Sequence, residues 1–144
     1  MVTGIEFSRK LLLVYNEMCK PLCHELKLPQ TAFDILMFLA NNPEYRTARD
    51  IVEIRKIKAN LVSVHVDMLV KEGYLIRQPV EGDRRKTELL CTDKALPVIE
   101  KGRMLQQNFT EKIFENTDEQ AKAAFLEMLK HIEDNLNTFL EGDC

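Results

Sequence analysis

The segment CKPLCH, residues 19–24, holds three side chains that bind metals or react with oxidants, namely Cys19, Cys23 and His24. Cysteines four residues apart share one face of a helix, so two thiolates there would supply half of a tetrahedral zinc site. His24 is rotated by one residue from that face, and the sequence has no second cluster of Cys and His. We therefore predict no metal and interpret both thiols as core residues, which behave as small apolar groups.

Reversible oxidation is the alternative chemistry for Cys19 and Cys23. It requires a thiolate with a depressed pKa, and Lys20 and His24 nearby favour the charged form of a thiol. A regulator that senses oxidants through Cys19 or Cys23 therefore stays open as an alternative hypothesis. The sequence shows no signal peptide and no apolar stretch that would span a bilayer, so we expect a cytoplasmic protein, without membrane association, whose cysteines are reduced.

A cluster of three basic residues, 84–86, stands within the segment VEGDRRKTELLCT at residues 80–92. The whole chain has a formal charge of −3, yet residues 44–94 hold 11 Lys and Arg against 9 Asp and Glu, a balance of +2. The remaining residues hold 9 against 14, a balance of −5. Positive charge is thus concentrated in the middle of the chain, where cations on a loop tip would bind a phosphate backbone without reading its sequence.

Two opposite faces are predicted for a helix in the segment KANLVSVHVDMLVKEG, residues 58–73. At about 100° per residue, Val62, Val66 and Leu69 fall in one narrow arc. The opposite side, with Ser63 at its border, holds Asn60, Val64, Asp67 and Lys71. One face suits a protein core, and the other suits either solvent or the major groove of DNA.

The elements around these residues are mostly helical. Apolar periodicity and breaking residues predict helices over residues 5–26, 31–42, 47–56, 58–72 and 92–114 and from residue 117 onward. Pro97 is expected either to kink the first turns of the 92–114 helix or to delay its start. Thr47 and Thr117 are the expected N-caps of two of them. YLIRQPV and TELLCT, separated by a turn with Gly82 and Asp83, predict a β-hairpin. This order indicates a mainly α (α+β) fold, a winged helix-turn-helix core with helices added at both ends.

Catalytic motifs are absent from the sequence. It has no glycine-rich phosphate loop, no Gly-x-Ser-x-Gly and no His-Glu-x-x-His, and no nucleophile has an evident partner. We therefore predict neither an enzyme nor a cofactor.

The segment DRRKTELLCT resembles the wing signature D-x-R-x-x-x-L-x-L-T of the MarR family (multiple antibiotic resistance regulators). The matching residues are Asp83, Arg85, Leu89 and Thr92, and Cys91 replaces the second Leu. Upstream, DMLVKEGYLIR is similar to the family pattern L-x-x-x-G-x-x-x-R, through Leu69, Gly73 and Arg77. The resemblance also covers the order of the elements from end to end.

This resemblance implies a homodimeric transcriptional regulator that binds double-stranded DNA at a pseudo-palindromic operator. Residues 1–28 and 93–144 would form the helical dimerisation region, and residues 29–92 would form the winged helix-turn-helix. Asp83 would hold Arg85 by a charge-assisted hydrogen bond. The residues expected to contact DNA are Lys58, Asn60, Ser63, Val64, Arg84, Arg85 and Lys86. Val64 and His65 depart from the Arg and Leu of many relatives, and Val64 is expected to touch a thymine methyl group.

Most members of the family respond to small aromatic or phenolic compounds bound between the dimer helices and the winged region. Tyr15, Phe33 and Met37 are the candidates for such a ligand site here, although core packing explains them as well. A winged-helix module that binds proteins and no DNA is the remaining alternative. It would need no basic hairpin, whereas a DNA-binding protein loses affinity steeply as the salt concentration rises.

Overall fold

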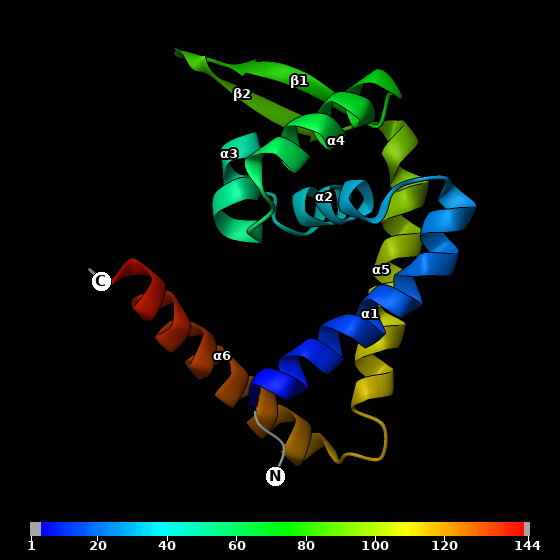
Figure 1. Cartoon of the computed structure of the whole chain (residues 1–144), viewed down its shortest axis with the longest axis vertical. Helices are drawn as coiled ribbons and strands as arrows, with labels where there is room; N and C mark the ends of the chain where they lie inside the picture. The colour runs from blue at the N-terminus through cyan, green and yellow to red at the C-terminus, as the bar shows by residue number, and fades with distance from the viewer. Residues whose placement is uncertain (1–3, 143–144) are drawn as a thin grey trace. The chain divides into compact units, whose positions relative to one another are not determined.

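The computed structural model describes residues 4–142 and is mainly α-helical with one β-hairpin, which confirms the predicted fold class. In chain order the elements, shown in Figure 1, are α1 (Gly4–Leu26), α2 (Gln30–Asn41), α3 (Ala48–Asp50), the π-helical turn η1 (Ile51–Arg55), α4 (Ala59–Lys71), β1 (Leu75–Val80), β2 (Asp83–Cys91), the 3-10 turn η2 (Asp93–Ala95), α5 (Leu96–Ile113) and α6 (Glu119–Glu141). The chain divides into two compact units, residues 1–109 and residues 110–144. No helix within the described residues has the length and apolar character to cross a bilayer.

Helix α2 is the centre of the first unit, because seven of its twelve residues are buried. It contacts α1, α4, β2 and η1, and in Figure 1 α4 lies between α2 and the hairpin. Helix α5 also passes close to α2. A Cβ atom at Gly102 would stand 2.4 Å from the Sδ of Met37 and 3.0 Å from a ring carbon of Phe33. Glycine at position 102 therefore permits the close approach of the two helices.

The connection from α2 to α4 is a short helix that changes geometry halfway. Thr47 caps it: the Thr47 hydroxyl accepts from the N–H of Asp50, and the Asp50 carboxylate accepts from the N–H of Thr47. Both bonds satisfy N–H groups that a helix start leaves open, so the predicted cap is confirmed. The helix then widens into the π-helical η1 and ends at Lys56, whose φ of 64° lies in the left-handed region.

Strands β1 and β2, here called the wing together with their turn, pair in antiparallel fashion. The pairing is regular from Leu75 opposite Cys91 to Pro79 opposite Thr87, but the next pair joins Val80 to Asp83. Residues 84–86 therefore form a bulge with no partner position on β1. Pro79 explains where regular pairing stops, because proline has no N–H to donate to the ladder.

Helix α5 has the delayed start that was one of the two effects expected of Pro97, whereas the start of α6 differs from the prediction. The 3-10 turn η2 precedes α5, so Pro97 stands in the first turn of the α-helix, where a proline is tolerated. Helix α6 begins one residue later than expected. Asp118, and not Thr117, is its N-cap, with its carboxylate accepting from the N–H of Ala121 at 2.7 Å.

Candidate nucleic-acid interface

Helix α4 has the two faces that its sequence predicts. Val62, Val66 and Leu69 are buried in the core, whereas Asn60, Ser63 and Val64 are exposed. Val64 leaves 62% of its surface open, an unusual position for an apolar residue on an otherwise polar stripe. The helix therefore presents a face of mixed apolar and polar character to solvent, as direct contact with bases in a major groove requires.

The amino end of α4 carries positive charge and open backbone donors. Lys58 is its N-cap and makes no side-chain capping hydrogen bond. Since a helix start concentrates partial positive charge on unpaired N–H groups, this end is suited to an anion such as a phosphate.

An acid on the exposed face of α4 is neutralised by the wing. The Arg77 guanidinium, on β1, pairs with the Asp67 carboxylate on α4. This bridge removes the charge that would repel a phosphate backbone and also joins the helix to the hairpin. Arg77 belongs to the L-x-x-x-G-x-x-x-R spacing of the sequence and Asp67 to its polar stripe, but their partnership depends on the hairpin packing against α4.

The basic residues of the wing lie within β2 and not on the turn, which corrects the expectation of a loop tip. Arg84, Arg85 and Lys86 are exposed and form the bulge that pairs with no residue of β1. A bulge leaves its residues unpaired and bends its strand, so three consecutive cations lie exposed near the end of the hairpin. Asp83 holds Arg85 as predicted: its carboxylate accepts a charge-assisted hydrogen bond from the backbone N–H of Arg85 at 3.0 Å.

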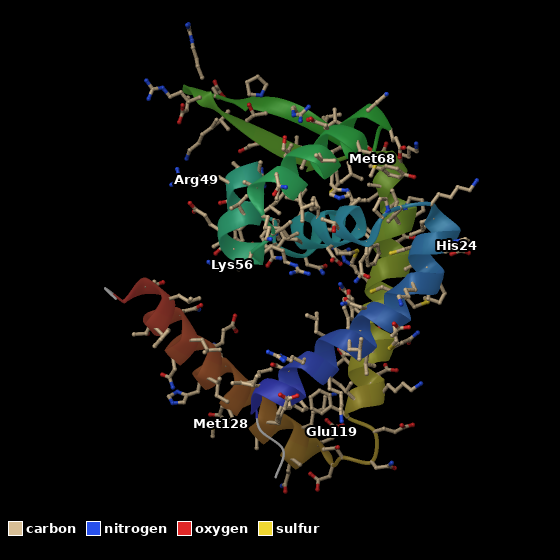
Figure 2. All side chains as sticks on the ribbon, viewed as in Figure 1. His24, Arg49, Lys56, Met68, Glu119 and Met128 are labelled. Atoms are coloured by element: carbon tan, nitrogen blue, oxygen red, sulfur yellow. The ribbon has the colours of Figure 1, made fainter. Side chains whose placement is uncertain are left out.

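Two further cations belong to the segment before α4, where Figure 2 labels Arg49 and Lys56. Arg49 is paired with Glu53 at 2.7 Å, which reduces its value for binding an anion. Lys56 is exposed and follows η1 in the left-handed conformation. Neither residue is predicted from the sequence, because nothing in a short helical segment marks which side it exposes.

The three residues expected to bind an aromatic ligand separate in the structure. Tyr15 and Met37 line a cavity of 170 Å³ together with Asp34, Arg55 and Gln106. Phe33 is not among the lining residues; it is fully buried and packs beside Met37 against Gly102. The Tyr15 hydroxyl accepts from the Gln106 amide at 3.1 Å, and burial raises the pKa of Tyr15 to about 12.

Asp34 places an acidic side chain with a raised pKa in the lining of this cavity. Its side chain is 18% exposed, and its nearest cation is the Arg55 guanidinium at 3.6 Å. Burial raises the pKa of Asp34 to about 6, although the charge of Arg55 acts in the opposite direction. Desolvation thus outweighs the ion pair, as is common when a carboxylate is buried with a single loose partner.

Cys19 and Cys23 belong to the core, as their interpretation as apolar residues predicts. Burial raises the pKa of Cys19, and it raises that of Cys23 to about 11. The redox hypothesis required the opposite shift, because oxidants attack the thiolate. Within residues 4–142, no three His, Cys, Asp or Glu side chains are placed together to hold a metal ion.

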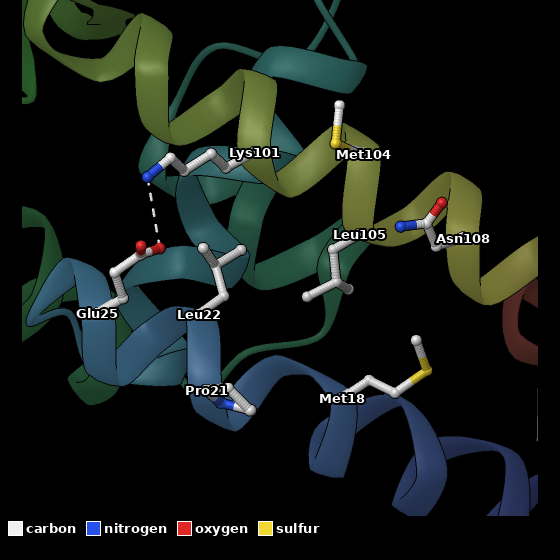
Figure 3. A pocket seen from close by; sticks show the side chains of 8 residues that line it. All are labelled: Met18, Pro21, Leu22, Glu25, Lys101, Met104, Leu105 and Asn108. Atoms are coloured by element: carbon white, nitrogen blue, oxygen red, sulfur yellow. Dashed lines mark hydrogen bonds and ion pairs between the residues drawn. The ribbon is translucent and has the colours of Figure 1, made fainter.

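A groove between α1 and α5, shown in Figure 3, has a volume of 630 Å³. Met18 and Leu22 of α1 face Met104 and Leu105 of α5 across it, and the Lys101 ammonium stands 3.4 Å from the Glu25 carboxylate at one end. The groove belongs to the helices outside the winged region and is mainly apolar.

The sequence of this chain is similar to known transcriptional regulators. Residues 26–86 match the model of the MarR family. The HTH-type transcriptional regulator PecS of Dickeya dadantii is 32% identical over 94 residues, which cover 64% of this chain and 56% of PecS. This chain therefore spans about half the length of that curated relative.

Solved structures share the fold over almost the whole chain. A MarR-family chain from Listeria monocytogenes, crystallised in complex with 26mer DNA, superposes with a TM-score of 0.85 at 16% identity and covers 100% of this chain and 98% of its own. The MarR protein from Peptoclostridium difficile gives a TM-score of 0.81 at 22% identity, with 98% and 96% covered. At these identities the likeness establishes the fold alone.

Proposed function

We propose that this chain is a member of the MarR family, whose model residues 26–86 match, and that it is a transcriptional regulator that binds double-stranded DNA. The proposal rests mainly on the winged region, residues 29–92. It exposes one face of α4, neutralises the acid on that face through Arg77, and adds three bulged cations on β2. PecS is named a transcriptional regulator, and the similar Listeria chain was solved with DNA, which supports the same role here.

The candidate residues divide into two roles in this proposal. Asn60, Ser63 and Val64 contact base edges in the major groove, where Val64 packs against a thymine methyl group. Lys58, Arg84 and Lys86 contact phosphates and set affinity without reading sequence. Arg85 joins them, with its backbone held in place by Asp83. Arg side chains on the wing also suit a narrow minor groove, where negative potential is concentrated.

The proposed assembly is a homodimer that binds a pseudo-palindromic operator. Its main support is α6, which has no buried residue, although apolar side chains recur along it at steps of three and four. The seam consists of Phe125, Leu129, Ile132, Leu136 and Phe139, each at least 43% exposed. Such heptad spacing is typical of a helix that packs against other helices, and a second copy of the chain supplies them here.

A small aromatic or phenolic ligand is proposed to modulate DNA binding from the cavity beside Tyr15. Helix α1, helix α2 and η1 all contribute to its lining, and η1 leads directly into α4. A ligand that binds one arrangement of these elements more tightly would change the position of α4 and thereby the affinity for DNA. Phe33 would act indirectly, by supporting Met37.

Selection of binding sites from random DNA duplexes at two salt concentrations tests the proposal. We expect an enriched inverted repeat and an affinity that falls steeply with salt, because released counterions contribute to binding. Arg84→Gln should reduce the slope of log affinity against log salt by about 0.9, the value for one phosphate contact. Arg9→Gln, an exposed arginine on α1, is the matched control and should leave the slope unchanged.

Three other outcomes would reject parts of this proposal. Absence of any enriched sequence, together with weak salt dependence, would favour a protein-interaction module. Enrichment of a single half-site would contradict the dimer. Equal slopes for the wild type and Arg84→Gln would remove Arg84 from the interface.

A further inference from the structure

A cavity of 340 Å³ lies on the side of the winged region formed by the end of α2, the segment 42–46, the end of β2 and the start of α5. It shares no lining residue with the cavity beside Tyr15. The backbone N–H of Leu89, on β2, donates to the carbonyl of Arg46 at 2.6 Å and holds the segment 42–46 against the strand. This backbone hydrogen bond therefore fixes the wall of the cavity that residues 42–46 form.

Most of the lining is apolar. Leu39 and Ile99 are buried at the base, and Leu96 leaves 50% of its surface exposed. The Tyr45 ring, which also lines the cavity, stacks on Phe38 with centroids 6.0 Å apart and an interplanar angle of 11°. The volume falls within the range of roughly 300–1,000 Å³ that is usual for small-molecule sites.

Two guanidinium groups provide the polar part of this lining. Arg103 donates to the Asn41 side-chain oxygen at 3.2 Å and to the Ala40 carbonyl at 3.0 Å, both neutral acceptors. The Arg46 guanidinium donates to the Pro43 carbonyl at 2.8 Å, and the carboxylate nearest to this guanidinium, that of Glu88, is 4.0 Å away. None of the described residues that line the cavity is acidic. The positive charge of Arg103 is therefore oriented by hydrogen bonds but not neutralised.

The thiol of Cys91, which also lines the cavity, lies within the influence of this charge. The thiol is partly buried, and burial raises its pKa, while the charge of Arg103 acts to lower it. Arg103 thus produces a positive field at the lining and not only at the outer surface. A carboxylate placed there would exchange water for a guanidinium partner that is already oriented, which lowers the entropic cost of binding.

We propose that this cavity binds a small organic carboxylate with a compact apolar body. The carboxylate pairs with Arg103 and Arg46, and the apolar body packs against Leu96, Ile99 and Tyr45. The ligand would join the segment before α3 to α5, because Arg46 and Arg103 belong to these two parts. The proposal does not depend on DNA binding and stands whether or not an operator is found.

Cyclohexanecarboxylate is a suitable probe, with cyclohexanecarboxamide and acetate as comparisons. The amide keeps the apolar body without the charge, and acetate keeps the charge with almost no body. Titration of the ¹⁵N-labelled full-length protein should shift the amide signals of residues 89–96, 98, 99 and 103. We expect the carboxylate to bind at least about tenfold more tightly than either comparison, as a bidentate pair to guanidinium and burial of an apolar body each contribute.

Two variants locate the site. Arg103→Gln should weaken binding of the carboxylate by about tenfold, and Leu96→Glu should abolish it by placing an acid at a half-exposed wall. Lys101→Gln is the matched control, because Lys101 is on the same helix but lines the α1–α5 groove. The Lys101→Gln variant should bind the probe with the affinity of the wild type. Thermal denaturation of each variant shows whether the fold is kept.

Alkylation of Cys91 gives a second measurement. Iodoacetamide alkylates the thiolate, forming a thioether and releasing iodide, and bound carboxylate should slow this reaction at Cys91. Equal binding of carboxylate and amide would overturn the proposal, as would equal binding of carboxylate and acetate. Wild-type affinity in both Arg103→Gln and Leu96→Glu would overturn it too, as would shifts confined to residues around Tyr15.

Discussion

Asp34 is the residue whose charge state the fold alters most clearly. Its carboxyl lies on α2 and faces Arg55 from η1, while the groups on α1 that sense its charge are Tyr15, Cys19 and Cys23. Because its pKa is about 6 in the folded chain against 3.8 in a model compound, the native protein binds more protons than the unfolded chain between pH 4 and pH 6. The contribution of Asp34 to the free energy of unfolding therefore decreases as the pH rises through that window.

Asp34→Asn should remove this pH dependence. A shift of about two pKa units corresponds to roughly 3 kcal/mol, so the wild type should lose about that much stability relative to the variant between pH 3 and pH 7. Urea denaturation of both proteins at several pH values measures the difference. Asp134→Asn, which removes the same charge from exposed α6, is the control. A constant difference between the wild type and Asp34→Asn at all pH values would contradict the assignment.

Among the elements, the helix N-caps show how precisely a local sequence pattern predicts the residue at which a helix begins. Thr47 and Thr117 stand in similar sequence contexts, each followed three residues later by a side chain that can complete a capping box. Thr47 forms the box with Asp50, whereas at α6 the aspartate at position 118 takes the cap position instead. Aspartate and threonine are both good caps, and propensity alone does not decide between adjacent ones.

The two threonines provide a matched pair of substitutions. Thr47→Ala should decrease the free energy of unfolding by about 1 kcal/mol, because the N–H of Asp50 loses its acceptor. Thr117→Ala should change it by less than about 0.3 kcal/mol, because Asp118 caps α6 without it. Chemical denaturation followed by circular dichroism gives both values. A larger loss for Thr117→Ala than for Thr47→Ala would reverse the assignment of caps.

The sequence predicts most elements because their signals are local. The apolar arc of Val62, Val66 and Leu69 and the breaking residue Pro29 act within a turn or two, and the structure agrees with them. The bulge at residues 84–86 was not predictable in this way, since it depends on which residue of β1 faces which residue of β2. The Asp67–Arg77 bridge and the separation of Phe33 from Tyr15 also arise from packing between elements.

At the scale of the whole molecule, the apolar seam of α6 and the basic wing occupy different units of the chain. The seam lies in residues 110–144 and the wing in residues 1–109. A protein with a formal charge of −3 can therefore bind an anionic polymer, because its acids are concentrated outside the winged region. Association through α6 would also place two winged units in one particle, as a pseudo-palindromic site requires.

Leu136→Lys should weaken this association. Leu136 belongs to the seam and is 58% exposed, and a lysine there would carry charge into the proposed interface. Sedimentation velocity over a range of concentrations should show a dimer for the wild type and a shift toward monomer for the variant. Asn137→Lys adds the same charge at the neighbouring position, away from the seam, and should stay dimeric. A monomeric wild type at every concentration would contradict the proposed dimer.

The wing is a two-stranded sheet, so each of its strands has an edge where another chain can add a strand. Pro79 removes one donor near the end of β1, and the cationic bulge of β2 interrupts the ladder over three positions. Like charges on neighbouring molecules also repel one another. The cations proposed to bind phosphate thus have a second consequence: they keep the wings of separate molecules from joining edge to edge and so favour solubility before any DNA is bound.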